Sequence, residues 1–423
     1  MSEGLAARRA AVALLLEATG SGRLLSDILA DPTGPLAGLN GPDRARAQRL
    51  TLATLRRIQP ADATIAPHIR RTPAPLVLAV LRLAVAELAE RPQDAHGIVS
   101  EAVTLVRSDP KSTQASGFVN AVLRRISAAP VTLETQRLPV WLRRPLVQRF
   151  GKATVKAIEA AHLAGPMLDL TVRHSADTAL WADRLGAEVL PGGSLRLAPG
   201  VQVTALPGYE TGEWWVQDAA AAIPARVLAV QPGESVLDMC AAPGGKTLQL
   251  AAAGARVVAL DASGARMERV RENLARTGLQ AELVVADALE WQGATGFDAI
   301  LLDAPCSATG TIRRHPELPF VKDPADLPGL VALQSALIDR AIALLRPGGR
   351  LVYCTCSLLP DEGENQMAAA LDRHPQMARD QKAVAGWPGN WDAKGGGLRI
   401  RPDHWAERGG LDGFFIGAMR KSA

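Results

Sequence analysis

The sequence predicts a doubly wound α/β domain preceded by an all-α domain, with a small α/β connector between them. Apolar residues recur at spacings of three and four over residues 1–130, and short alternating runs fill residues 131–215. Strand-like and helix-like segments then alternate over residues 216–423. Because 423 residues exceed what a single hydrophobic core usually organises, we expect these three segments to be separate domains.

The N-terminal segment is expected to be a compact helical bundle. Helical spacing of apolar residues occurs in the stretches 10–20, 46–58, 75–88, 96–108 and 117–128. Pro, Gly and Asp separate these stretches, as expected for the ends of helices in a bundle. The first stretch follows two arginines, as in a signal peptide, but no cleavage site of small residues is obvious, so we expect a helix there.

Charge is distributed unevenly along the chain. Residues 1–165 contain 22 Lys and Arg against 13 Asp and Glu, a net charge of +9, whereas the remaining residues contain 25 against 30. Of the 22 basic residues 19 are Arg, which suits bidentate contacts with phosphate. The excess fits either a nucleic-acid-binding surface or an ordinary solvated helical surface.

The connector is expected to begin with helix and continue as short strands. Residues 141–165 keep helical spacing. Apolar residues then alternate with turn residues in the stretches 168–175, 187–200 and 201–208, which indicates a few short strands.

The C-terminal segment has the pattern of βαβ units. Strands are predicted at 235–240, 255–261, 281–287, 298–306 and 349–357, with helices at 246–254, 265–278 and 336–349. Such alternation predicts a parallel, doubly wound sheet, which binds ligands beyond the carboxyl ends of its strands.

The end of the first predicted strand suits a nucleoside ligand. The glycine pair Gly244-Gly245 precedes a helix, so the backbone can approach a ligand closely. The loop matches neither G-x-G-x-x-G nor a Walker loop, which requires glycine where Cys240 stands. Asp261 and Asp287 end the next two strands, where acids can accept hydrogen bonds from ribose hydroxyls and an adenine amine, although either can also cap the following helix.

Two thiols follow the fourth and fifth predicted strands. If these strands are neighbours, Cys306 and Cys356 face one crevice, whereas Cys354 precedes its strand end and is expected in the core. No pattern of zinc ligands accompanies them. A thiolate beside an adenosyl cofactor suits methylation of cytosine C5, because its addition to C6 makes C5 nucleophilic. Asp303, close before Cys306, is placed to support protonation at N3.

Four stretches resemble the NOL1/NOP2/Sun family of RNA cytosine-5 methyltransferases: DMCAAPGGKT, DAPCSATGTIRRHPE, LVYCTCSLLPDEGENQ and GLDGFFIGAMRK. In the N-terminal part, IVSEAVTLVR and GFVNAVLRRI are similar to NusB-like RNA-binding helical domains. The combination resembles bacterial enzymes that methylate 16S ribosomal RNA. The resemblance covers nearly the whole chain and is strongest from Val216 onward. It implies a Rossmann-like methyltransferase domain over 216–423, a NusB-like RNA-binding domain over 1–130 and a connector over 131–215.

The resemblance also implies roles for individual residues. Cys356 would be the nucleophile and Cys306 would help to release the product, with Asp303 near the base. The residues implied to line an S-adenosylmethionine site are Cys240, Ala241, Ala242, Pro243, Gly244, Gly245, Lys246, Asp261, Asp287 and Asp303. Arg266 either supports the ribose or forms a surface ion pair.

Arg313, Arg314 and His315 follow the ProCys loop and either contact RNA phosphates or lie in a solvated loop. The expected partner is 16S ribosomal RNA. The cysteines in motif-like segments favour a reducing cytoplasm, and no apolar run reaches the length of a membrane span. We expect a monomer without a metal.

The sequence leaves three alternative interpretations of the function. The first is a nucleophile at Cys306, as in DNA cytosine-5 methyltransferases, which the ThrCysSer motif at Cys356 opposes. The second is an RNA-binding assembly factor with a vestigial site. The third is an NAD-dependent enzyme, which the missing G-x-G-x-x-G disfavours.

Overall fold

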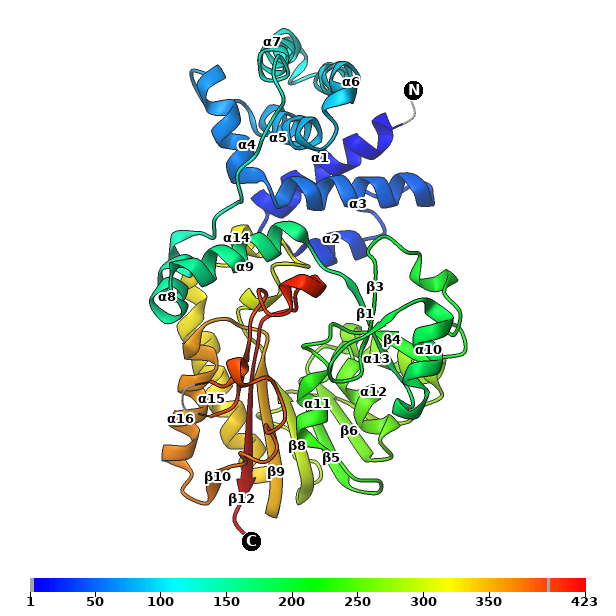
Figure 1. Cartoon of the computed structure of the whole chain (residues 1–423), viewed down its shortest axis with the longest axis vertical. Coiled ribbons are helices and arrows are strands. Elements are labelled where there is room, and N and C mark those ends of the chain that lie inside the picture. The colour runs from blue at the N-terminus through cyan, green and yellow to red at the C-terminus, as the bar shows by residue number, and fades with distance from the viewer. Residues whose placement is uncertain (1–3, 394–395) are drawn as a thin grey trace. The chain divides into compact units, whose positions relative to one another are not determined.

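The computed structural model describes residues 4–393 and 396–423, and the chain divides into two compact units. The first unit comprises the residues up to Ala164 together with Arg314–Asp323. The second comprises Gly165–Arg313 and Pro324–Ala423. Figure 1 shows the helices of the first unit and, in the second unit, two sheets together with helices.

The first unit is helical. Its helices are α1 (Leu5–Gly20), α2 (Leu25–Ala30), α3 (Gly41–Leu55), α4 (Ile58–Ile65), α5 (Pro75–Glu90), α6 (Ala95–Arg107), α7 (Ser116–Ile126), α8 (Val140–Phe150), α9 (Lys152–Ala164) and α14 (Leu318–Val321). Helix α5 contacts α1, α3, α4, α6 and α7, which explains why it is apolar on nearly all sides. Its buried Glu87 forms hydrogen bonds of 2.8 and 2.7 Å with Arg8 of α1, so the charge inside this core is paired.

The start of α3 shows how the sequence defines a helix end. The Asn40 side chain accepts a hydrogen bond of 2.8 Å from the Asp43 backbone N–H, and Pro42 stands in the first turn, where its missing N–H costs nothing. The expected helix at the start of the chain is confirmed by α1.

The second unit contains two sheets. The smaller sheet is antiparallel, in the order β2-β3-β1-β4, and is formed by β1 (Leu168–Val172), β2 (Glu188–Val189), β3 (Leu195–Leu197) and β4 (Trp214–Val216), with α10 (Thr178–Leu185) beside it. The larger sheet has the order β10-β12-β9-β8-β5-β6-β7, with β11 paired to β12.

The elements of the larger sheet follow one another along the chain. They are α11 (Ile223–Leu228), β5 (Ser235–Met239), α12 (Gly245–Ala252), β6 (Arg256–Asp261), α13 (Gly264–Thr277), β7 (Glu282–Val285), β8 (Phe297–Asp303), α15 (Leu327–Leu344), β9 (Leu345–Thr355), α16 (Glu364–Arg373), β10 (Met377–Arg379), β11 (Leu398–Ile400) and β12 (Phe414–Lys421).

The central strands are apolar on both faces because helices cover both. Leu237, Ile300 and Leu351 pack in one core cluster with residues of α15 and α16. Their neighbours along the strands, such as Val236 and Leu301, pack in another cluster with α11 and α12. Figure 1 shows α15 and α16 on one side of the sheet and α11 and α12 on the other. The strand order reverses between β5 and β8, so a ligand crevice is expected at their carboxyl ends.

Several details of the predicted organisation differ from the structure. Strands β5 to β9 are parallel, as predicted, but β10, β11 and β12 join the sheet antiparallel and were not expected. The helices expected at 141–165 lie in the first unit, whereas the connector strands lie in the second. Residues 201–208 form no strand, because Val203–Ala205 tighten into a short 3₁₀ turn, and the fourth strand of the small sheet is Trp214–Val216 instead.

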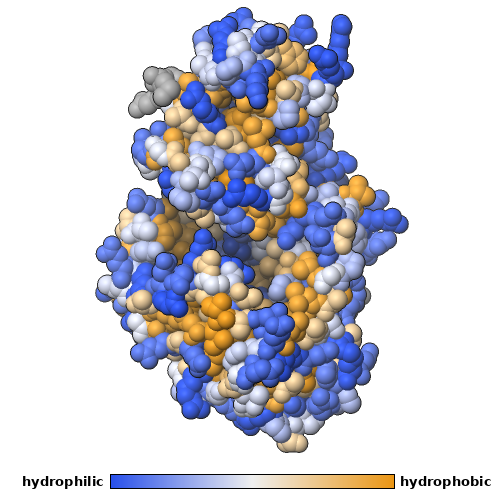
Figure 2. Space-filling model, turned by 180° about the vertical axis from the view of Figure 1, so that it is seen from behind, coloured by the Kyte–Doolittle hydropathy of each residue, from blue (hydrophilic) through white to orange (hydrophobic). Residues whose placement is uncertain are grey.

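One helix in the described part of the chain, Pro324–Leu344, is long and apolar enough to cross a membrane. It packs against β8 and β9, and its Leu337, Ile338 and Ala341 are fully or almost fully buried in the core. A third of its apolar stretch is buried, so one face of this helix belongs to the core of the second unit. On the face shown in Figure 2, hydrophobic and hydrophilic residues are interspersed.

Candidate active site

The loop after β5 brings backbone to the carboxyl edge of the sheet. Gly244 has φ of +99° and lies directly before α12. A Cβ atom there would lie 3.0 Å from the Val270 side chain of α13, so both the backbone angle and the close packing require glycine. The loop before it is packed inward at Ala241 and Ala242, whereas Pro243 is exposed. This packing of Gly244 against α13 places the N-terminus of α12 at the carboxyl end of β5.

Asp261 at the end of β6 fixes this loop. One carboxylate oxygen accepts a hydrogen bond of 3.1 Å from the Ala242 N–H, and the other accepts one of 2.9 Å from the Ser263 N–H. Arg266 lies 3.9 Å from Asp261, donates to the Ala242 carbonyl and keeps an exposed side chain. The arginine therefore bridges the two strand ends.

Asp287 lies two residues beyond the end of β7 and is exposed. Its carboxylate accepts a hydrogen bond of 2.9 Å from the Leu289 N–H, as in a turn cap. Val285 and Leu289 beside it are 53% and 37% exposed. This exposed apolar surface next to an acid was not recognised in the sequence, because the two residues lie in an otherwise ordinary strand and turn.

Lys246 and Asp303 form an ion pair where β5 and β8 end. Lys246 Nζ donates to an Asp303 oxygen at 2.7 Å and lies 5.5 Å from the centre of the Phe414 ring. Burial alone would lower the pKa of Lys246, but the negative charge of Asp303 raises it above its ordinary value, so the lysine stays a cation. Cys354, fully buried as predicted, donates from Sγ to the other Asp303 oxygen at 3.4 Å.

Burial raises the pKa of two further groups in this region, Asp238 and Cys240. Asp238 is fully buried and accepts a hydrogen bond of 2.6 Å from the Thr247 hydroxyl. Burial is the main reason that its pKa is raised to about 7. Burial also raises the pKa of the Cys240 thiol, so this cysteine is a poor candidate for a thiolate.

The two thiols of interest lie together, as expected from their positions after neighbouring strands. Strands β8 and β9 pair in parallel with Asp303 opposite Cys354, and the Sγ atoms of Cys306 and Cys356 are 3.5 Å apart. Both side chains are partly exposed. The hydrogen bond with Cys356, burial and nearby negative charge all raise the pKa of Cys306.

Gly310 shows how three of the sequence motifs meet at the thiols. Its N–H donates to the Cys356 carbonyl at 2.8 Å, and its carbonyl accepts from the Gly413 N–H at 2.7 Å. A Cβ atom on Gly310 would lie 2.0 Å from the Gly413 carbonyl oxygen, so no other residue fits. The ProCys loop, the ThrCysSer segment and the segment before β12 therefore form one assembly.

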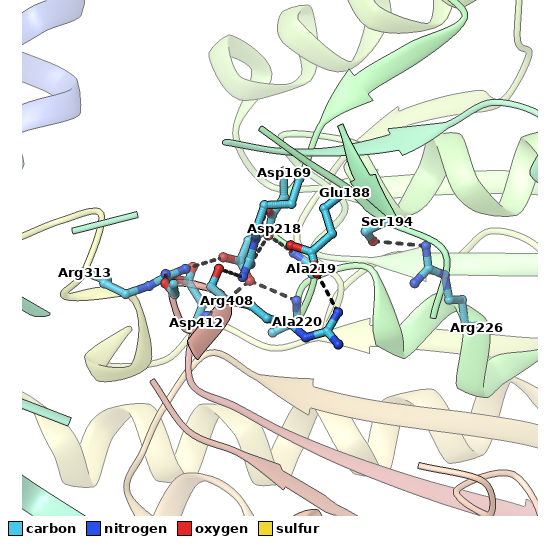
Figure 3. A network of polar contacts seen from close by, with 12 residues as sticks. Asp169, Glu188, Ser194, Asp218, Ala219, Ala220, Arg226, Arg313, Arg408 and Asp412 are labelled. Carbon is cyan, nitrogen blue, oxygen red and sulfur yellow. Dashed lines mark hydrogen bonds and ion pairs between the residues drawn. The ribbon is translucent and has the colours of Figure 1, made fainter. Parts of the chain in front are cut away.

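Arg313 does not have the place that was expected for it. The side chain is fully buried, 2.9 Å from Asp218 and 3.7 Å from Asp412, and it donates to the Gly409 carbonyl (Figure 3). The prediction that Arg313 contacts RNA phosphates or lies in a solvated loop is therefore wrong, because its guanidinium neutralises carboxylates inside the second unit.

The same polar network reaches the small sheet. Asp169 of β1 pairs with Arg196 of β3 at 2.7 Å and accepts a hydrogen bond from the Ala219 N–H, next to Asp218 (Figure 3). Arg314 and His315 belong to the first unit, where His315 lies 3.5 Å from Glu317, and their role with RNA stays a prediction.

The larger sheet is a doubly wound, Rossmann-like sheet, and the chain is similar in sequence and structure to methyltransferases. Two solved structures from Pyrococcus horikoshii share the fold. NSun6 with SFG matches 69% of this chain and all of its own at 22% identity and a TM-score of 0.59. A methyltransferase homologue matches 66% of this chain and 94% of its own at 27% identity and a TM-score of 0.54.

Sequence comparisons define the family. Residues 225–420 match the model of the 16S rRNA methyltransferase RsmB/F family, and residues 5–128 match the NusB family. Ribosomal RNA small subunit methyltransferase B of Pseudomonas putida is 36% identical and covers all of this chain and 99% of its own length. The protein of the same name from Xanthomonas campestris is 36% identical over 88% of each chain. The chain belongs to the ribosomal RNA small subunit methyltransferase B family.

Proposed function

We propose that this chain transfers a methyl group from S-adenosylmethionine to C5 of a cytosine in 16S ribosomal RNA, through a covalent bond between Cys356 and C6. The main support is a pair of partly exposed thiols, 3.5 Å apart, on the same crevice as the Lys246–Asp303 ion pair. Membership of the family supports the methyl transfer and the ribosomal RNA substrate.

The residues around β5, β6 and β7 fit an adenosyl cofactor. Helix α12 begins at the carboxyl end of β5, and Asp261 ends the strand where a ribose is bound in related nucleotide folds. Val285 and Leu289 offer apolar surface to a base beside Asp287. When bound, the cofactor supplies an electrophilic methyl group.

Cys356 is the proposed nucleophile. Addition of its thiolate forms the Sγ–C6 bond and moves an electron pair to C5. C5 would then bond to the methyl group as the bond between that methyl and the cofactor sulfur breaks, which leaves S-adenosylhomocysteine. In the release step a base takes the C5 proton, the C5–H electron pair re-forms the C5–C6 double bond, and the Sγ–C6 bond breaks to free the Cys356 thiolate. We assign Cys306 as the base that accepts this proton, because its sulfur lies 3.5 Å from that of Cys356.

Asp303 is the group that we assign to the proton at N3 of the base. Its side chain is 29% exposed, and Lys246 holds one of its oxygens, so its orientation is fixed before RNA binds. Addition of the thiolate pushes negative charge onto the ring, and a proton held between Asp303 and N3 neutralises that charge.

The RNA is expected to contact the basic N-terminal helices, whose arginines suit phosphate. We further propose that the protein acts as a monomer in the cytoplasm, where ribosomal subunits are assembled.

The order of the two cysteines can be tested by trapping the covalent intermediate. Cys306→Ala should still allow attack and methylation by Cys356 but stall release, so that a protein–RNA adduct accumulates. Cys356→Ala should form no adduct and no 5-methylcytosine. The measurement is denaturing gel electrophoresis of each variant with substrate RNA and cofactor, with ribonuclease treatment as the control. The opposite pattern would make Cys306 the nucleophile.

A further inference from the structure

We propose that Glu362 is a positioning residue, whose carboxylate holds the Cys306 loop and the Cys356 loop at the spacing that lets both thiols act on one base. Only the catalytic consequence rests on the function proposed above, because the spacing itself can be measured without activity. Glu362 lies just before α16, between the ThrCysSer segment and the helix, and is fully buried.

The carboxylate of Glu362 accepts four hydrogen bonds. One oxygen accepts from the Ser307 backbone N–H at 2.8 Å and from the Gln334 side chain at 3.0 Å. The other accepts from the hydroxyls of Ser307 and Ser357, each at 2.5 Å. All four donors are neutral, so this buried charge is stabilised by hydrogen bonds from neutral groups.

These donors belong to both thiol loops. Ser307 directly follows Cys306, and Ser357 directly follows Cys356, so one carboxylate holds the residues next to both sulfurs. Gln334 extends the link, because its amide also donates to the Pro305 carbonyl at 2.8 Å. The hydroxyls of Ser307 and Ser357 also lie 3.2 Å apart, and the Thr309 hydroxyl lies 3.2 Å from that of Ser357. Glu362 is the charged group at the centre of this cluster, to which both serine hydroxyls donate.

Glu362 is itself held in place from the sheet. Its backbone carbonyl accepts hydrogen bonds from the Tyr353 hydroxyl at 2.6 Å and from the Thr355 hydroxyl at 3.1 Å, both from the end of β9. Beyond the ends of β8 and β9, backbone and side-chain donors no longer have hydrogen-bond partners in a neighbouring strand. When such donors are buried, an acceptor such as the Glu362 carboxylate is needed to satisfy them. A group fixed on the sheet and bonded to both loops sets their separation.

The matched substitutions separate hydrogen bonding from charge. Glu362→Ala removes all four contacts. Glu362→Gln keeps the shape, and its amide can donate to the two serine hydroxyls, which are able to accept as well as donate. Glu234→Ala is the control, because Glu234 pairs with Arg350 where β5 begins, away from the carboxyl ends of the strands.

The spacing is measured by oxidation with diamide, which takes up two electrons and two protons as Cys306 and Cys356 form a disulfide. The linked peptides are counted by mass spectrometry over time. The wild type, Glu362→Gln and Glu234→Ala should form the bond at similar rates, and Glu362→Ala should form it more slowly, because disulfide geometry tolerates little separation. A folded Glu362→Ala protein that links at the wild-type rate overturns the proposal, and so does a Gln variant as slow as the Ala variant.

Kinetics supply the second readout. Glu362→Ala should lower kcat about 10²-fold with little change in the KM for cofactor, because misplaced reacting groups cost rate rather than binding. Glu362→Gln should recover most of that loss. If Glu362→Ala does not fold, the double variant Ser307→Ala/Ser357→Ala removes two donors from the other side and must slow disulfide formation in the same way. If the oxidation results hold but no RNA adduct ever forms, the proposed function fails and the positioning role stands.

Discussion

The two units of the molecule bury charge in different ways. In the helical unit, the core of α5 and its neighbours is apolar, and the Arg8–Glu87 pair joins two helices inside it. In the sheet unit, buried polar groups gather where the strands end, as at Asp238, Lys246 and Glu362. Because buried polar groups cost free energy unless each is satisfied, their concentration at one edge indicates a site shaped by chemistry rather than by stability.

The largest difference is expected when a buried ion pair is compared with a half-exposed one. Arg313→Met leaves Asp218 and Asp412 buried without this guanidinium and should lower the free energy of unfolding by about 3–5 kcal/mol. Arg82→Met in the helical unit breaks a pair with the partly exposed Asp62 and should cost at most about 1 kcal/mol. Urea unfolding followed by circular dichroism and tryptophan fluorescence measures both. Equal effects would show that the polar network of the second unit is not a structural requirement.

A smaller effect is expected at the proposed cofactor site, at the end of β6. Asp261→Ala removes a charged acceptor and should weaken binding of S-adenosylhomocysteine by about 1.5–3 kcal/mol in a calorimetric titration. Saturating cofactor should restore most of the rate, because the thiols and Asp303 are unchanged. If it does not, Asp261 is not mainly a binding residue. Arg266→Ala, with its exposed side chain, is the control and should weaken binding less.

The smallest effect is expected for the exposed basic residues of the helical unit. Arg44 and Arg49 are exposed on α3, and replacing both with Gln should reduce the slope of log affinity for RNA against log salt by about 1–2. Affinity for the cofactor and the rate at saturating RNA should not change. Fluorescence anisotropy with labelled RNA at several salt concentrations gives the slope, and an unchanged slope would remove α3 from the RNA-binding surface.

The sequence predicted those parts of the fold in which local pattern and burial agree. Helix α5 and strands β5 to β9 are apolar segments separated by turn residues, and the meeting of Cys306 and Cys356 followed from their places after two strands. The antiparallel β12 was missed, because pairing partners far apart in sequence leave no local signal.

The side chains of the site were harder to predict than its strands. Arg313 stands in a loop rich in basic residues, and nothing local shows that Asp218 and Asp412, distant in sequence, surround it. Glu362 lies in the LLPDEGENQ stretch that follows the ThrCysSer motif, yet its bonds to Ser307 and Ser357 depend on the fold. The one available signal was an acidic residue at fixed spacing after a thiol motif, and that spacing alone does not distinguish a buried acceptor from a solvated one.

The position of β12 has a consequence for the order in which a newly made chain becomes active. This strand lies between β9 and β10, and the segment just before it holds Gly310 through Gly413. During translation helices α1 to α9 emerge before any strand of the larger sheet. The thiol loops cannot take their final positions until residues beyond 413 have left the ribosome. A chain interrupted before that point would carry the complete N-terminal helices and an unfinished thiol site.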